Sequence, residues 1–207
     1  MQRVGSLDGL RGIAAIIVLL HHASAQVGGF PLFGSGYLAV DFFFMLSGYV
    51  VALAYERRLA GELGAARFMV LRIKRLYPLM AIGIIAGAAV ALAGGMPGAA
   101  VGWHLAAQLA FVPIIAGSAG LYILNGVQWS LFFELFANAM HAVQLRRWSG
   151  RAMVAAVIAS LVLLAWTASR FEWFGLGDRG NNFIGGFPRV AFAYCVGVAM
   201  VRLGPAI

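Results

Sequence analysis

Long apolar segments recur along the whole chain and limit what it can fold into. A helix needs about 17–25 apolar residues to cross the hydrocarbon core of a bilayer. Only 11% of the 207 residues are charged and 62% are hydrophobic, whereas a soluble domain has about 25% charged residues. We therefore predict an all-α, polytopic transmembrane bundle of about six to seven membrane segments in a single domain, residues 1–207. The predicted spans are residues 12–29, 37–55, 76–92, 127–143, 152–167 and 187–201.

The basic residues predict how these spans are oriented. The net charge is +8, and Arg and Lys gather in the gaps between apolar segments, as the positive-inside rule describes, so no nucleic-acid partner is expected. The basic cluster between Arg57 and Arg75 should be cytoplasmic, which places the N-terminus in the cytoplasm. Residues 103–115 are apolar but short and contain Pro113. If they crossed, the Arg146 region would lie outside, so we expect them not to form a full span.

Ionisable side chains within membrane segments are costly and often functional. His22, Asp41 and Glu134 are predicted to lie roughly 6–11 Å below the outer surface, which is close enough to share a cavity. A carboxylate beside His22 would fix its tautomer. The alternative is that backbone or hydroxyl groups satisfy each residue separately. Arg11 lies eleven residues before His22 on the same helix face, although Asp8 offers Arg11 a simpler local partner.

A second group of candidates precedes the third predicted span. Arg72 and Arg75 are three residues apart and therefore share a helix face. Guanidinium groups at a cytoplasmic helix end can bind phosphates. A topology signal or contact with lipid head groups explains the same pattern.

Several of these residues also belong to distinctive strings. In chain order the strings are LDGLRGIAA (7–15) with His22 downstream, VDFFFMLSGY (40–49), RF (67–68) with RIKRLYP (72–78), QWSL (128–131) followed by Glu134, and FPRV (187–190) followed by Gly197. Their combination and order resemble the membrane-bound acyltransferase 3 family, over essentially the whole chain.

The resemblance implies transfer of an acyl group, usually acetyl, to a hydroxyl of a carbohydrate or cell-envelope glycan in a bacterial inner membrane. Acetyl-CoA would be the donor substrate, with no permanently bound cofactor and no metal site. His22 would be the general base and Arg11 its essential motif partner, and Arg72 and Arg75 would bind the phosphates of coenzyme A. The remaining motif positions are two further catalytic candidates, Asp41 and Glu134, and three substrate-binding candidates, Ser47, Trp129 and Ser130.

The chain departs from the family pattern in two places. Leu135 follows Glu134 where many members have a second acid, and many members have about ten helices. The resemblance therefore implies a truncated or fragmentary member that lacks C-terminal helices. Two other hypotheses stay open: an inactive truncated protein, and a secondary transporter with a proton relay through His22, Asp41 and Glu134.

Overall fold

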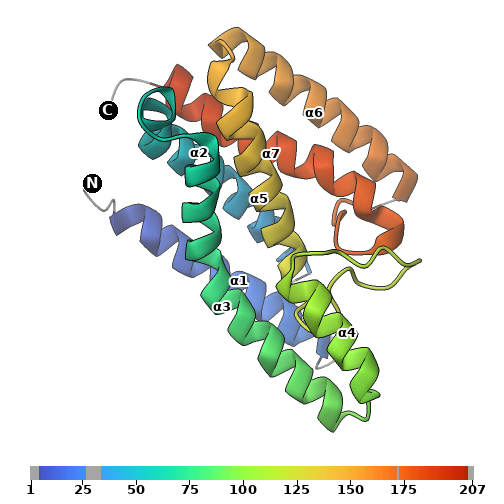
Figure 1. The fold of residues 1–207 in the computed structure, drawn as a ribbon. Helices are drawn as coiled ribbons and strands as arrows, with labels where there is room; N and C mark the ends of the chain where they lie inside the picture. The colour runs from blue at the N-terminus through green and yellow to red at the C-terminus, as the bar shows by residue number, and fades with distance from the viewer. Residues whose placement is uncertain (1–4, 27–33, 172, 205–207) are drawn as a thin grey trace.

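The computed structural model describes residues 5–26, 34–171 and 173–204, and the regular elements in these ranges are helices (Figure 1). The all-α prediction is therefore confirmed. The seven α-helices are α1 (Gly5–Gln26), α2 (Leu38–Ala60), α3 (Ala65–Ala93), α4 (Gly98–Leu109), α5 (Gln128–Val143), α6 (Gly150–Phe171) and α7 (Gly186–Leu203). Two short 3-10 helices, η2 (Leu145–Arg147) and η3 (Gly180–Gly185), precede α6 and α7.

Four helical units are long and apolar enough to cross a membrane. They are α2, α3, α6 and the continuous segment Gly180–Leu203, which joins η3 to α7. The apolar part of α1, Gly9–Ser24, is shorter. The protein is thus an integral membrane protein with a helical bundle. The predicted end of the first span at residue 29 and the side chain of Asp8 lie outside the described part of the chain.

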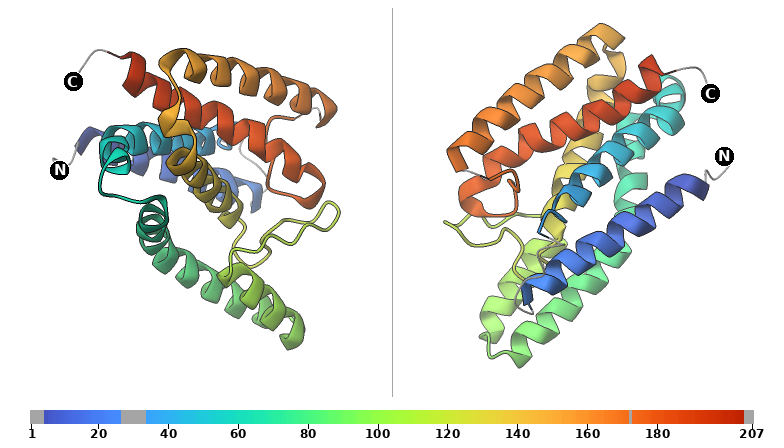
Figure 2. Two further views of the ribbon diagram at one scale, coloured as in Figure 1. Left: turned by 45° about the horizontal axis from the view of Figure 1, so that its top comes forward. Right: turned by 180° about the vertical axis from the view of Figure 1, so that it is seen from behind.

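The helices form two layers. One layer contains α6, α7, α2 and α1 in that order, and the other contains α4, α3 and α5 (Figure 2). The first turn of α1 and the last turn of α7 lie at the same end of the molecule (Figure 2). Arg202, in the last turn of α7, therefore lies at the end of the molecule where α1 begins.

The third helix differs most from its prediction. The apolar pattern placed its start at residue 76, but α3 begins at Ala65 and Pro78 lies inside it. The basic stretch is therefore the first part of the helix rather than a loop. Helix α3 can include it because Arg72 is buried against an acid of α5, while Lys74 and Arg75 are exposed.

Residues 103–115 were expected not to form a full span, and the helix in this region is short. Helix α4 has 12 residues, about 18 Å of helix, against a hydrocarbon core of about 30 Å. The chain then runs through an irregular loop, residues 110–127, which pairs with the loop before η3. Leu121 donates its backbone N–H to Asp178, and Gly180 donates to Ala119, each at 3.0 Å. These bonds hold the two loops together at one end of the bundle.

Two glycines let α2 and α7 approach backbone to backbone. A Cβ atom at Gly48 would lie 2.1 Å from the carbonyl oxygen of Tyr194, and one at Gly197 would lie 1.9 Å from that of Met45. Small residues at such crossings are typical of membrane helix pairs. The contact fixes the position of α2, which carries two of the candidate residues, Asp41 and Ser47.

Gly48→Ala and Gly197→Ala should therefore each separate α2 from α7. We expect a loss of about 1–3 kcal/mol of stability from overpacking, measured as a lower thermal midpoint of the detergent-purified protein. Gly102→Ala is the control, because a Cβ there meets nothing within 4 Å. Midpoints equal to that of Gly102→Ala would contradict this description of the interface.

Candidate functional site

A cavity of about 550 Å³ lies between α1, α2, α3 and α5 and contains most of the predicted site residues. Three candidates for catalysis, Arg11, His22 and Glu134, line it. The substrate-binding candidates that line it are Ser47, Arg72, Arg75, Trp129 and Ser130. The structure thus collects residues from four helices that are far apart in the sequence, and of the predicted set Asp41 alone is missing from this lining.

A buried ion pair occupies the middle of the cavity. Arg72 on α3 is 4% exposed, and its guanidinium donates to Glu134 on α5 at 2.5 Å. Ser47 on α2 donates to the same carboxylate oxygen at 2.9 Å. A charge in a low-dielectric interior needs such a partner, because its desolvation costs several kcal/mol. The pair therefore joins α3 to α5, and Ser47 adds α2.

Asp41 forms a second ion pair at the outer end of α2, defined as the end farther from Arg57. Arg189 on α7 reaches it with two hydrogen bonds, from Nε at 2.7 Å and from Nη2 at 3.1 Å. Arg189 also donates to the backbone carbonyls of Leu176 and Tyr37, at 3.1 and 3.0 Å. The guanidinium thus ties α7 to the start of α2 and to the loop before η3.

Arg189 was not among the predicted site residues. It is 2% exposed, lines the cavity, and its guanidinium carbon lies 5.3 Å from the ring centre of Trp129 and 5.7 Å from that of Tyr37. Such cation–π contacts add to the hydrogen bonds. The signal in the sequence was an arginine inside an apolar helix, in the FPRV string, which is itself a reason to suspect function.

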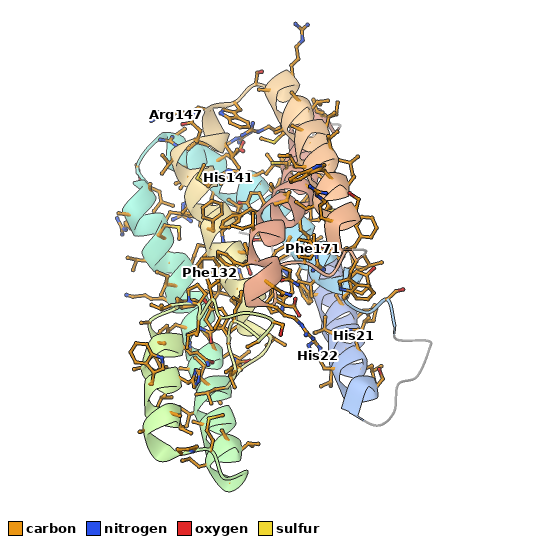
Figure 3. All side chains as sticks on the ribbon, turned by 90° about the vertical axis from the view of Figure 1, so that its right-hand side faces the viewer. His21, His22, Phe132, His141, Arg147 and Phe171 are labelled. Atoms are coloured by element: carbon orange, nitrogen blue, oxygen red, sulfur yellow. The ribbon has the colours of Figure 1, made fainter. Side chains whose placement is uncertain are left out.

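His22 lies near the outer end of α1, and Figure 3 shows it beside His21, well below Arg147 and above the lower ends of α3 and α4. Its Nδ1 lies 2.9 Å from the carbonyl oxygen of Val18. A carbonyl only accepts, so Nδ1 carries the proton, and the lone pair of neutral His22 is on Nε2. The side chain is exposed, and Nε2 is the atom able to accept a proton from a ligand.

The predicted convergence is found for two of the three residues, because His22 and Glu134 line the same cavity and Asp41 does not. Asp41 is paired with Arg189 and Glu134 with Arg72, while a backbone carbonyl holds His22. Glu134 also lies deeper, because its partner Ser47 is six residues along α2 from Asp41, a rise of about 9 Å. The loop of residues 110–127 occupies the outer level, so α5 starts below it. The alternative, satisfaction by backbone or hydroxyl groups, holds for His22 and in part for Glu134 through Ser47, but each acid is mainly paired with an arginine.

The inner end of the cavity is basic. Arg11 is partly buried, Arg75 is exposed, and both line the cavity. From Arg11 to His22 the cavity follows α1 over eleven residues, about 16 Å. Four arginines line it, Arg11, Arg72, Arg75 and Arg189, against the acids Glu134 and Asp178 of the lining and Asp41, which pairs with Arg189. An excess of guanidinium groups suits an anionic ligand with several phosphates.

Fold and site together define a polytopic membrane protein with an internal cavity that is lined by arginines and has a histidine near one end. The family model described as an acyltransferase domain, acyltransferase 3, matches residues 4–207. The chain therefore belongs to the acyltransferase 3 family, and it is an acyltransferase. This assignment replaces the alternative of a transporter with a proton relay through His22, Asp41 and Glu134.

Individual relatives agree with this family. The chain is 36% identical to protein 2 in the picA locus of Rhizobium radiobacter, over 82% of this chain and 97% of that protein. It is 33% identical to a putative O-acetyltransferase of Staphylococcus aureus over 40% of this chain, and 36% identical to an O-acetyltransferase of the same species over 35% of it. The chain spans only 13% and 11% of those two proteins. No solved structure matches.

Arg189→Lys should weaken the contact between α2 and α7 that Arg189 makes with Asp41. Lysine keeps the charge but cannot make the fork of bonds to Asp41 and the two carbonyls. We expect a loss of about 2 kcal/mol, or about 4–8 °C in thermal midpoint for a chain of this size, with lower acyl-transfer activity. Arg147→Lys, at an exposed position, is the matched control. An unchanged midpoint for Arg189→Lys would show that the fork is dispensable.

Proposed function

We propose that the protein transfers an acyl group, acetyl in the first instance, from acyl-CoA to a hydroxyl of a carbohydrate of the cell envelope, with His22 as the general base. The single observation that carries this proposal is the position of His22. Its Nδ1 is held by Val18, its Nε2 is the basic atom, and it shares one cavity with a group of arginines.

The distribution of charge supports coenzyme A as the donor. Its phosphates would bind at the inner end of the cavity, where Arg11 and Arg75 lie. The pantetheine arm would then run along α1 toward His22, a distance similar to its own length. Arg72 is less suited to phosphate binding than its exposed neighbour Arg75, because its side chain is buried and its Nη2 already donates to Glu134 and Ser47. In this proposal Arg72 shapes the middle of the cavity and Arg75 meets the phosphates.

The proposed orientation follows from the same polarity. Arg57 and Arg58 end α2, Arg146 and Arg147 form η2, and Arg202 ends α7. The positive-inside rule places this end in the cytoplasm, where coenzyme A is available, in a bacterial inner membrane with a cytoplasmic N-terminus. His22 and the joined loops then lie toward the outer side, where an envelope glycan would be the acceptor.

The proposed reaction is a direct transfer. Nε2 of His22 removes the proton from the acceptor hydroxyl as its oxygen attacks the thioester carbonyl. A new C–O bond forms and the C–S bond breaks. The leaving thiolate takes the proton from His22, so the base is restored and free CoA thiol is released with the ester.

His22→Ala should lower acyl transfer by about 10²–10⁴-fold, the usual contribution of a general base. The rate is measured as CoA thiol released from acetyl-CoA in the presence of envelope glycan, with protein amount in the membrane unchanged. His104→Ala removes a histidine of α4 that is not part of the cavity lining and should leave the rate unchanged. Transfer that persists in His22→Ala would reject the proposed base.

Arg75→Gln should weaken acetyl-CoA binding. A hydrogen bond to a charged group contributes about 1.5–3 kcal/mol, so the Kd measured by calorimetry should rise at least about tenfold. Arg151→Gln, at an exposed position outside the cavity lining, is the control. Acetyl-pantetheine, which has no phosphates, should bind wild type and Arg75→Gln equally. A selective loss of acetyl-pantetheine binding would place Arg75 at the thioester instead.

A further inference from the structure

A second cavity, of about 350 Å³, lies at the outer end of the molecule under the joined loops. Residues 118–126 form one wall, and Asp178 and Arg179 form the other. The cavity shares three lining residues with the larger one: His22, Trp129 and Asp178. The two cavities therefore meet at the histidine.

We infer that this second cavity is the acceptor subsite, and that it binds one end of a hydroxyl-rich saccharide beside Nε2 of His22. The inference rests on the proposed function and adds to it the place where the acceptor binds and the residues that would contact it. Direct transfer requires donor and acceptor to reach one base at the same time. Two cavities that share His22 provide this arrangement.

The charges of the two cavities separate donor from acceptor. The second cavity has one acid, Asp178, and one guanidinium, Arg179, so its formal charge is balanced and it does not favour a ligand with several phosphates. Its size is at the lower end of the range for small-molecule sites. It suits a neutral saccharide end better than a whole coenzyme.

The lining can recognise hydroxyl groups. Ser118 is exposed and can donate and accept hydrogen bonds. Asp178 receives a hydrogen bond from Asn182 on Oδ1, at 2.9 Å, and its Oδ2 lies 3.7 Å from Nε of Arg179. The side chain of Asp178 is 37% exposed, so this carboxylate retains capacity for a ligand hydroxyl. Trp129 adds an aromatic surface next to His22.

Hydrogen bonds within the protein hold the walls of the second cavity in place without a ligand. Asn182 accepts hydrogen bonds on its side-chain oxygen from the backbone N–H groups of Gly177 and Arg179, both at 3.0 Å. Leu121 donates to the carbonyl of Asp178. A preorganised rim loses less conformational entropy when a ligand binds.

Gly126 allows a direct test, because it lines the second cavity and a Cβ built on it meets nothing within 4 Å. In Gly126→Trp the indole should fill the subsite. Membrane vesicles with each variant receive radiolabelled acetyl-CoA and isolated cell-envelope glycan, and the label that mild alkali releases from the glycan is counted. Calorimetry with purified protein measures acetyl-CoA binding.

We expect Gly126→Trp to lower transfer to the glycan at least about tenfold while the Kd of acetyl-CoA stays within about twofold of wild type. Ser118→Trp, from an exposed turn of the same wall, should have the same effect and provides the test if Gly126→Trp elutes as an aggregate. Gly102→Trp on α4 has equal open space and is the control for adding an indole.

The outcomes separate the two proposals. If wild-type vesicles transfer no label, the proposed function is wrong. If they do, and Gly126→Trp and Ser118→Trp transfer as well as Gly102→Trp, the acceptor subsite lies elsewhere and the proposed function stands. Loss of acetyl-CoA binding in a monodisperse Gly126→Trp protein would assign the second cavity to the donor and overturn the inference.

Discussion

The pairing of buried arginines with carboxylates determines how this bundle is built. Arg72 and Arg189 are buried charges, and their pairing with Glu134 and Asp41 offsets the cost of removing them from water. Each pair links helices that are distant in the sequence, and the two pairs lie at different depths. Because both guanidinium groups line the main cavity, the interactions that hold the helices together also supply its polar walls. Stability and the shape of the site therefore depend on the same side chains.

The polarity of the cavity gives the proposed reaction a direction. Its inner end has exposed positive charge at Arg75, its middle is neutralised by the Arg72–Glu134 pair, and its outer end has the histidine. An anionic coenzyme that entered from the inner end would carry its uncharged thioester farthest into the cavity, toward the histidine. This arrangement separates the phosphate-binding end from the site of proton transfer by most of the length of α1. A substitution at one end of the cavity therefore need not alter the chemistry at the other.

Composition and hydrophobic segments were sufficient to predict a helical membrane bundle, because backbone groups in lipid have few alternatives. The strings around Arg11, Ser47, Arg72 and Trp129 also identified residues that share one cavity. Partners were harder to predict. The depth of each residue below the outer surface was estimated from the end of its predicted span. The estimate was wrong for Glu134, because the loop of residues 110–127 lies at the outer level and α5 starts deeper in the bundle than the other helices. The importance of Arg189 depended on four acceptor contacts from α2 and a distant loop, which no local pattern contains.

The hydrogen bond from His22 to the carbonyl of Val18 has a consequence for mutational studies. The tautomer is set by the main chain of α1. An alanine scan removes side chains and leaves carbonyls in position, so it would pass over this contact completely. Only a change that bends α1, such as a proline within the following turn, would remove the acceptor while leaving the histidine in the sequence.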